Sequence, residues 1–162
     1  MTYRIFLFLS FICFSSCNNE MVFSKYTSLP MVWHKDSLVK FNFQINNNSN
    51  RYNTYINLRV NDEYIFNNIF LIVNFQNSNN ILSIDTLEYP MATNSGELIG
   101  RKLIGITENK LIHKENIDLS KDEEYQISIS HSMRLINKTE GIELLEGILD
   151  VGYSIEEIKD KQ

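Results

Sequence analysis

Cysteine is nearly absent from this sequence. The chain of 162 residues has two, Cys13 and Cys17, and both lie near the N-terminus. Cys13 falls inside an apolar segment that we expect to be removed, which leaves Cys17 as the single cysteine of the mature chain. An intramolecular disulfide is thereby excluded. A lone thiol in an exported protein needs another explanation, and lipid acylation supplies one.

Glycine and proline are also scarce, with six and two residues, whereas Phe and Tyr number ten and eight. Aromatic and β-branched residues favour pleated, half-buried surfaces. Asn-rich tracts at residues 46–50 and 77–80 take the place of glycine, because Asn tolerates the left-handed backbone geometry of tight turns. The composition therefore predicts strands joined by Asn-rich turns.

Positive charge is not concentrated anywhere in the chain. Lys and Arg total 15 against 20 Asp and Glu, for a formal charge of −5, and the two signs are interspersed. Such a chain is a poor electrostatic match for nucleic acid or for anionic lipid. We therefore expect no nucleic-acid partner.

No apolar run is long enough to span a bilayer. As a helix, the apolar residues 5–14 would reach about 15 Å, half of a hydrocarbon core of about 30 Å. One Arg precedes this run, and two serines and Cys17 follow it, which is the arrangement of a lipoprotein signal peptide with acylation at Cys17. Phe14 stands where such a processing site usually has Leu. The alternative is an ordinary secretory signal with incidental cysteines.

The chain divides into four parts on this interpretation. Residues 1–16 are the signal peptide, 17–28 the acylated cysteine and a short tether, 29–157 a single β-sandwich domain, and 158–162 a charged tail. We expect a lipid-anchored protein of the cell envelope, at the outer rather than the inner membrane. Residues 18–20 lack the strong acidic run associated with surface export, which favours the periplasmic side.

The hydrophobic periodicity is that of strands. Apolar and polar residues alternate over residues 39–45 and again over 125–134, as in strands with one buried face. Residues 55–60 alternate in the same way and, together with 39–45, indicate a hairpin. The continuous apolar run 69–73 indicates a central strand.

Two further segments are less regular. Glycines within residues 98–106 indicate a bend or a bulge, and residues 142–145 indicate one helical turn. Turns recur every eight to twelve residues and no long amphipathic helix is present. The chain therefore predicts an all-β fold, an antiparallel β-sandwich of immunoglobulin-like or jelly-roll-like type with about seven or eight strands and little helix.

Patterns typical of catalytic or metal sites are missing. His34, His113 and His131 are far apart and lack the close ligand pairs of zinc sites. His131 lies on the apolar side of its strand, which favours a hydrogen-bonded core histidine. The serine stripe within residues 128–132 has no base beside it, and no phosphate-binding glycine loop occurs. We expect no enzymatic activity, no cofactor and no metal.

Two non-catalytic roles remain open, a structural or assembly component of an envelope machine and a glycan-binding module. Trp33, the only tryptophan, is favoured as a core anchor, and the alternative is an exposed recognition residue. In the second case Trp33, His34 and Lys35 form a candidate interaction surface. Glycan binding would need exposed aromatic side chains on one sheet face, for which the candidates are Tyr52, Tyr55, Tyr64 and Tyr89.

Several short stretches follow one another through the mature chain in an order seen in a known family. They are Ser28-Leu29-Pro30, Trp33-His34-Lys35, Tyr55-Ile56-Asn57-Leu58-Arg59, Phe70-Leu71-Ile72-Val73, Asp85-Thr86-Leu87-Glu88-Tyr89, Glu108-Asn109-Lys110-Leu111, Met133-Arg134, Gly141-Ile142 and Gly147-Ile148-Leu149-Asp150-Val151-Gly152. With them the chain resembles the GldH family of gliding-motility lipoproteins of Bacteroidetes.

The resemblance implies a cell-envelope lipoprotein needed for gliding over surfaces, a process tied to the machinery that exports and moves surface adhesins. Its partners would be the membrane, through lipid on Cys17, and other motility or secretion proteins of the envelope. It implies no enzymatic activity, and Cys17 is the single functional residue that it transfers.

Two tripeptides, Asp36-Ser37-Leu38 and Asp85-Thr86-Leu87, resemble the acceptors of periplasmic O-glycosylation in that phylum. The resemblance makes Ser37 and Thr86 candidate modification sites. The alternative for Asp85-Thr86-Leu87 is an ordinary continuation of a strand.

Overall fold

The computed structural model describes residues 19–46 and 51–159, and within these ranges every regular element is a strand. No helix in the described ranges is long and apolar enough to cross a membrane. The eleven strands are β1 (Asn19–Ser28), β2 (Val32–His34), β3 (Val39–Gln44), β4 (Tyr52–Val60), β5 (Asn68–Asn77), β6 (Ile81–Pro90), β7 (Arg101–Leu103), β8 (Ile106–Ile117), β9 (Glu124–His131), β10 (Leu144–Glu146) and β11 (Ile148–Ile158).

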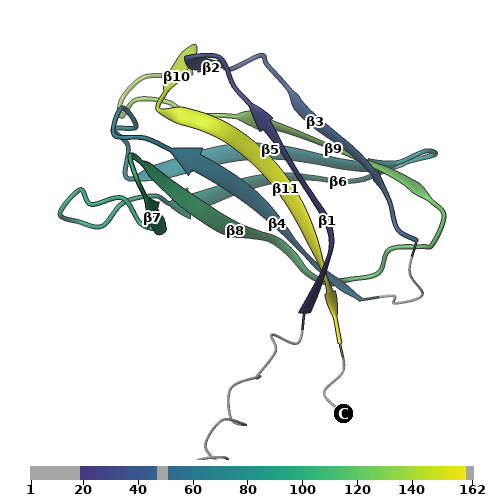
Figure 1. The fold of residues 1–162 in the computed structure, drawn as a ribbon. Coiled ribbons are helices and arrows are strands. Elements are labelled where there is room, and N and C mark those ends of the chain that lie inside the picture. Colours follow the sequence, from purple (N-terminus) through teal and green to yellow (C-terminus); the bar gives the residue numbers. More distant parts are fainter. Residues whose placement is uncertain (1–18, 47–50, 160–162) are drawn as a thin grey trace, which may run out of the picture.

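These strands form two packed antiparallel sheets (Figure 1). The large sheet has the order β1-β11-β4-β8-β7, and the small sheet has the order β3-β9-β5-β6. A separate pair, β2 with β10, closes one end of the sandwich. The predicted all-β sandwich is confirmed. The strands β2, β7 and β10 have three residues each, so the sandwich itself is built from the eight longer strands.

The strand pairs are nested about the turn between β5 and β6. β5 pairs with β6, β4 with β8, β3 with β9, β2 with β10, and β1 with β11, all of them antiparallel. The chain is therefore one long antiparallel ribbon whose two halves roll up into two sheets. This is jelly-roll topology, and it decides between the two architectures that the sequence left open.

The core lies between the sheets and follows the predicted alternation. Val39, Phe41 and Phe43 of β3 point inward and are at most 6% exposed. Val39 lies opposite Ile129 of β9, so the two strands with the clearest alternation are neighbours in one sheet. Full burial of such a side chain contributes roughly 1.5–3 kcal/mol, which makes this row a principal source of stability.

The tether predicted for residues 17–28 is wrong in its described part. Residues 19–28 are β1, which pairs with β11 from Asn19 opposite Ile158 to Ser28 opposite Asp150. The polar side chains of β1 made its sequence look like a tether. An edge strand with an exposed outer face needs few apolar residues, so its apolar pattern is weak. Residues 19–28 therefore belong to the folded domain, which was predicted to begin at residue 29. Ile158, placed in the predicted tail, is the last residue of β11.

The hairpin predicted for residues 39–60 is also wrong. β3 belongs to the small sheet and β4 to the large sheet, so the chain crosses between sheets at this point. Alternation fixes which face of a strand is buried, but it does not identify the neighbouring strand. The predicted helical turn at residues 142–145 is replaced by β10, whose Leu145 lies opposite Trp33 of β2.

The glycine-containing segment of residues 98–106 does bend. β7 and β8 form a tight hairpin that turns at Gly105, where φ is 71°. Gly100 also has a left-handed φ, 133°, and a Cβ there would lie 2.5 Å from the carbonyl oxygen of Glu108. The bend expected from these glycines is therefore confirmed.

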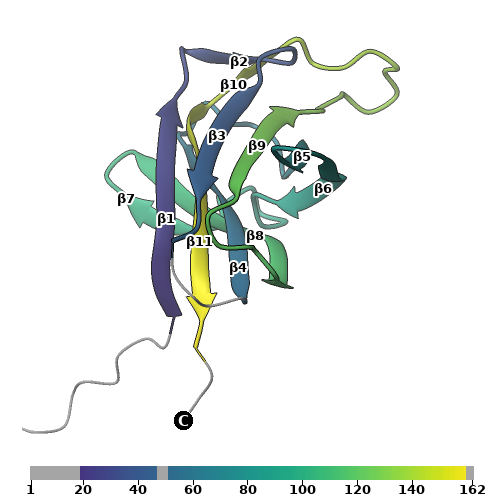
Figure 2. The same cartoon turned by 90° about the vertical axis from the view of Figure 1, so that its right-hand side faces the viewer.

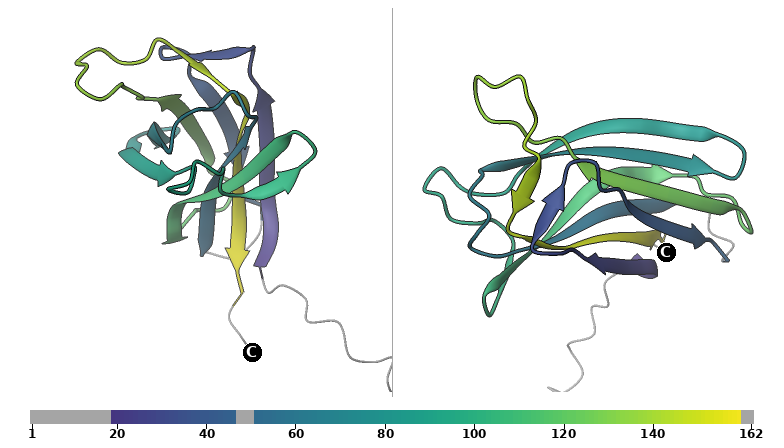
Figure 3. Two further views of the ribbon diagram at one scale, coloured as in Figure 1. Left: turned by 90° about the vertical axis from the view of Figure 1, so that its left-hand side faces the viewer. Right: turned by 90° about the horizontal axis from the view of Figure 1, so that it is seen from above.

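The first and last strands share one end of the sandwich. β1 begins and β11 ends side by side (Figure 2), and Lys159 Nζ lies 2.7 Å from Glu20 Oε2 there. The β2–β10 pair and the loop that precedes β10 lie at the opposite end (Figures 1 and 3). The chain thus enters and leaves the domain at one pole.

Candidate functional site

Trp33 is a core residue, so the exposed alternative for it is wrong. Its side chain is 1% exposed, and its ring N–H donates to the carbonyl oxygen of Ser37 at 3.0 Å. Its ring meets that of His131 edge to face, with 5.4 Å between the centroids. The candidate interaction surface therefore loses its central aromatic residue, while its two neighbours remain at the surface.

His34 and Lys35 flank the turn that follows β2. His34 is partly exposed, with Nε2 at 3.4 Å from Glu143 Oε1 and Nδ1 at 3.8 Å from Asp36 Oδ2. Lys35 is exposed. No group of three or more His, Cys, Asp or Glu within the described ranges is arranged to hold a metal ion. The two residues are thus accessible at the surface of the domain.

Ser37 and Thr86, the two candidate O-glycosylation sites, are both exposed. Ser37 lies in the turn between β2 and β3, where its N–H donates to the carbonyl oxygen of His34 at 2.9 Å. Thr86 lies in the middle of β6, opposite Ile72 of β5. Cys17, the predicted acylation site, lies outside the described residues.

The four tyrosines considered for glycan binding do not form an exposed aromatic surface. Tyr52 and Tyr64 are buried, at 0% and 4% exposure. The ring of Tyr55 is covered by Lys110, whose Nζ lies 3.9 Å from its centroid. Tyr89 donates its hydroxyl to the carbonyl oxygen of Ile112. Each ring is committed to packing or to a contact within the domain.

A polar network crosses the interior between the two sheets. The His113 side chain of β8 is fully buried, with Nδ1 at 2.8 Å from the Tyr153 hydroxyl and Nε2 at 3.2 Å from Asp85 Oδ2. A carboxylate only accepts hydrogen bonds, so Nε2 carries the proton and Nδ1 accepts from Tyr153. Lys114 Nζ and Ser83 Oγ also contact Asp85 Oδ2, at 2.9 and 2.7 Å. The network fastens β6 of the small sheet to β8 of the large sheet.

Burial controls the protonation of this network. Desolvation lowers the pKa of His113, although the hydrogen bond from its ring to Asp85 opposes the shift. Desolvation alone would raise the pKa of Asp85, but hydrogen bonds from Lys114, Ser83 and His113 outweigh it, and the pKa of Asp85 is lowered. Burial also lowers the pKa of His131, whose Nε2 donates to the carbonyl oxygen of Trp33 at 3.0 Å. The expectation of a core histidine at position 131 is confirmed.

Acidification is expected to destabilise the domain through these two histidines. A histidine whose pKa is lowered by folding binds its proton more readily in the unfolded chain, so stability falls as the pH drops below about 6.5. The free energy of unfolding should decrease by at most about 1.4 kcal/mol per pH unit for each buried histidine. The contribution of Asp85 is lost at lower pH, below its ordinary pKa of 3.8.

Urea titrations at pH 7.5 and at pH 5.5 measure this effect. The variant His113→Gln should have a shallower dependence on pH than the unsubstituted protein, because one of the two titrating groups is gone. An unchanged dependence in His113→Gln would contradict the assignment of His113.

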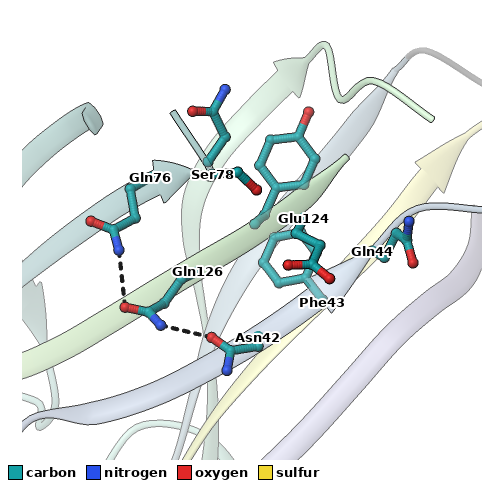
Figure 4. A pocket seen from close by; sticks show the side chains of 9 residues that line it. Asn42, Phe43, Gln44, Gln76, Ser78, Glu124 and Gln126 are labelled. Carbon is teal, nitrogen blue, oxygen red and sulfur yellow. Dashed lines mark hydrogen bonds between the residues drawn. The ribbon is translucent and has the colours of Figure 1, made fainter. Parts of the chain in front are cut away.

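A polar groove crosses three strands on the outer face of the small sheet (Figure 4). Gln76 Nε2 donates to Gln126 Oε1 at 3.1 Å, and Gln126 Nε2 donates to Asn42 Oδ1 at 2.8 Å. The groove has a volume of about 540 Å³, and its remaining walls come from Phe43, Gln44, Asn77, Ser78, Glu124 and Tyr125. It presents amide donors and acceptors, together with the side chain of Glu124.

A cluster of charged side chains lies on the outer face of the large sheet, and we call it the Arg59 cluster. Arg59 Nε lies 3.0 Å from Glu108 Oε1, and its guanidinium lies 4.2 Å from the centroid of the Tyr26 ring. Asp150 Oδ2 lies 3.7 Å from Arg59 NH1. The Tyr26 ring covers Gly152, where a Cβ would come within 2.7 Å of it.

Sequence reasoning missed both the Arg59 cluster and the His113 network. The members of the Arg59 cluster come from four strands and those of the His113 network from three, and they meet only when the ribbon has rolled up. The one available signal for the Arg59 cluster is that Arg59, Glu108, Asp150 and Gly152 all lie in stretches that carry the family resemblance.

Almost the whole chain is similar to known proteins. The model of the GldH lipoprotein family matches residues 21–155. The gliding motility lipoprotein GldH of Flavobacterium johnsoniae is 40% identical over 151 residues, which are 93% of this chain and 94% of that protein. A GldH homolog of Christiangramia forsetii is 38% identical over 155 residues, which are 95% of each. Among solved structures, Eiger TNF from S. frugiperda aligns at 8% identity with a TM-score of 0.38, covering 88% of this chain and 95% of that one.

Proposed function

Because the chain belongs to the GldH family of gliding-motility lipoproteins, we propose that it is a lipid-anchored component of the cell envelope that supports gliding through contacts with other proteins. The observation that carries the proposal is the extent of the match. Identity of 40% extends over almost the full length of both proteins, so the whole domain is shared, rather than one module of it.

The anchor in this proposal is lipid on Cys17. That residue lies two positions before β1, and two extended residues span only about 7 Å. The pole of the sandwich where β1 begins is therefore held against the membrane. The opposite pole, with the β2–β10 pair, faces away from it. We place the protein at the outer membrane, on its periplasmic side.

A non-catalytic role is part of the proposal. Two of the three histidines are engaged in structural contacts inside the domain. His113 joins the two sheets through Asp85 and Tyr153, and His131 holds the carbonyl oxygen of Trp33. The proposed activity is therefore to scaffold or stabilise the assembly that exports and moves surface adhesins.

A deletion strain tests the motility role. Colonies that lack this protein are expected to lose spreading on agar, and expression of the unsubstituted protein from a plasmid is expected to restore it. Normal spreading of the deletion strain would contradict the proposal.

Isolation of the membrane-bound protein in mild detergent tests the assembly role. Motility or secretion proteins of the envelope should be recovered with it, and should be missing when a tagged, unrelated lipoprotein is used as bait. If no such protein is recovered and the purified protein binds glycan, the glycan-binding alternative replaces this one.

A further inference from the structure

β6 is an edge of the small sheet and has one hydrogen-bonded neighbour, β5. It runs for ten residues, Ile81–Pro90, and in two views no other described strand lies beyond it (Figures 2 and 3). A strand of this length at an edge presents a row of backbone N–H and C=O groups that a further strand could pair with.

The residues with outward-facing backbone groups can be identified. Ser132 N donates to the carbonyl oxygen of Phe70, so Phe70 and every second residue of β5 after it face β9. The residues between them, such as Leu71 and Val73, face β6 and pair with Leu87 and Asp85. Ile84, Thr86 and Glu88 of β6 therefore direct their N–H and C=O groups away from the sheet.

The other edges carry the features by which proteins prevent strand addition. β1 is interrupted by a bulge between Met21 and Phe23, β3 carries Lys40, and β7 has three residues, two of them Arg101 and Lys102. β6 has no Lys or Arg at all. Three of its exposed side chains are aliphatic instead, with Ile81, Leu82 and Ile84 exposed at 60%, 47% and 63%, and Thr86 and Glu88 are exposed further along the strand.

Side chains of β6 that point into the sandwich also bind β8 and hold the edge strand in place. Asp85 points inward to Lys114 and His113 of β8, and Tyr89 bonds the carbonyl oxygen of Ile112. The single acidic side chain in the centre of β6 is thus neutralised inside the sandwich. What remains for a partner is an open backbone row beside exposed aliphatic side chains, with Glu88 as the exposed acidic residue near the C-terminal end of the strand.

We propose that β6 pairs antiparallel with β6 of a second copy of this chain. In the register that places Ile84 opposite Ile84 of the partner subunit, Leu82 lies opposite Thr86 and Asp85 opposite Ser83. No acidic residue then faces its own copy, and the exposed aliphatic side chains meet across the two-fold axis. Pairing of this kind extends the four-stranded small sheets of two copies into one continuous sheet.

A single introduced cysteine tests the pairing in the full-length protein. In this register the two residues at position 84 have Cα atoms about 5.5 Å apart, which suits a disulfide. Because acylation occupies Cys17, Ile84→Cys purified in mild detergent should give a covalent dimer on mild oxidation, and reductant should reverse it. The matched variant Lys40→Cys on the β3 edge, like the unsubstituted protein, should remain monomeric on a denaturing gel.

A second pair of variants separates backbone pairing from other contacts. Thr86→Pro removes an outward N–H that is not used by β5, and proline is tolerated on such an edge. Since two backbone hydrogen bonds are lost per dimer, its dissociation constant should rise about tenfold or more in sedimentation experiments. Thr86→Val keeps the N–H and should dimerise like the unsubstituted protein.

Three results would overturn the proposal. They are a covalent dimer with Lys40→Cys as strong as with Ile84→Cys, a monomeric unsubstituted protein at tens of micromolar concentration, and unimpaired dimerisation of folded Thr86→Pro. Loss of dimerisation in Thr86→Val would also overturn it, since the hydroxyl or a sugar on it, rather than the backbone, would then be responsible. If Thr86→Pro does not fold, Ile84→Lys takes its place.

Discussion

Replacement of Trp33 by alanine is expected to lower the free energy of unfolding by about 3–5 kcal/mol. The ring is 1% exposed and contacts His131, and its N–H is bonded to the carbonyl oxygen of Ser37. The substitution leaves a cavity under the β2–β10 pair and an unsatisfied backbone acceptor. Domains of this kind are stable by only about 5–15 kcal/mol, so the loss is a large fraction of the total.

Urea unfolding followed by far-UV circular dichroism measures this loss, because removal of the only tryptophan also removes its fluorescence. Lys35→Ala is the matched control, since Lys35 is two positions away and exposed, and it should change stability by less than about 0.5 kcal/mol. Equal stabilities of Trp33→Ala and Lys35→Ala would contradict the role of Trp33 as an anchor.

Replacement of Cys17 by alanine is expected to release the protein from the membrane or to block its processing. In our proposal, attachment to the membrane depends on the lipid carried by Cys17. Each buried methylene contributes roughly 0.8 kcal/mol; one chain holds only marginally, but two or more make anchoring effectively permanent. Cys17→Ala should therefore remove nearly all of the mature protein from the membrane fraction, rather than a part of it.

Fractionation of cells into membrane and soluble parts, with electrophoretic mobility as a second readout, measures the effect. Cys13→Ala is the control, because Cys13 lies in the segment that we expect to be removed, and it should leave the protein in the membrane fraction. Unchanged partitioning and mobility of Cys17→Ala would refute acylation at this residue. A released protein should also fail to restore spreading to the deletion strain.

The sequence was most informative where a single strand determines its own pattern. The alternation over residues 39–45 correctly gave the buried face of β3, whereas in β9 the polar residues Ser128 and Ser130 are buried along with the apolar ones, so the prediction of one exposed face is wrong there. Position 131 was interpreted correctly for the same reason, because a histidine on the apolar side of a strand has to find its partner in the interior. The glycines near the β7–β8 hairpin were informative for a similar reason, because a left-handed φ is a local requirement of the backbone.

What the sequence could not give is pairing between distant segments. The prediction of a hairpin over residues 39–60 was wrong because the alternation of apolar and polar residues does not identify the neighbouring strand. The same limit explains why β1 was mistaken for a tether, since its partner β11 lies at the other end of the chain. Arg59 and Glu108 are 49 positions apart, and His113 and Tyr153 are 40 apart, so neither contact leaves a local pattern.

The nested strand pairs also set the order in which the exported chain can fold. β5 and β6 can pair as soon as both have emerged, whereas β1 has to wait for β11, and contacts such as those of Ser28 with Asp150 and of Glu20 with Lys159 span 122 and 139 positions. Pairings of such long range form late. Until β11 is in place, the large sheet lacks the strand between β1 and β4, so β1 has no hydrogen-bonded neighbour. The rolled topology thus delays the closing of the domain until its last strand is available.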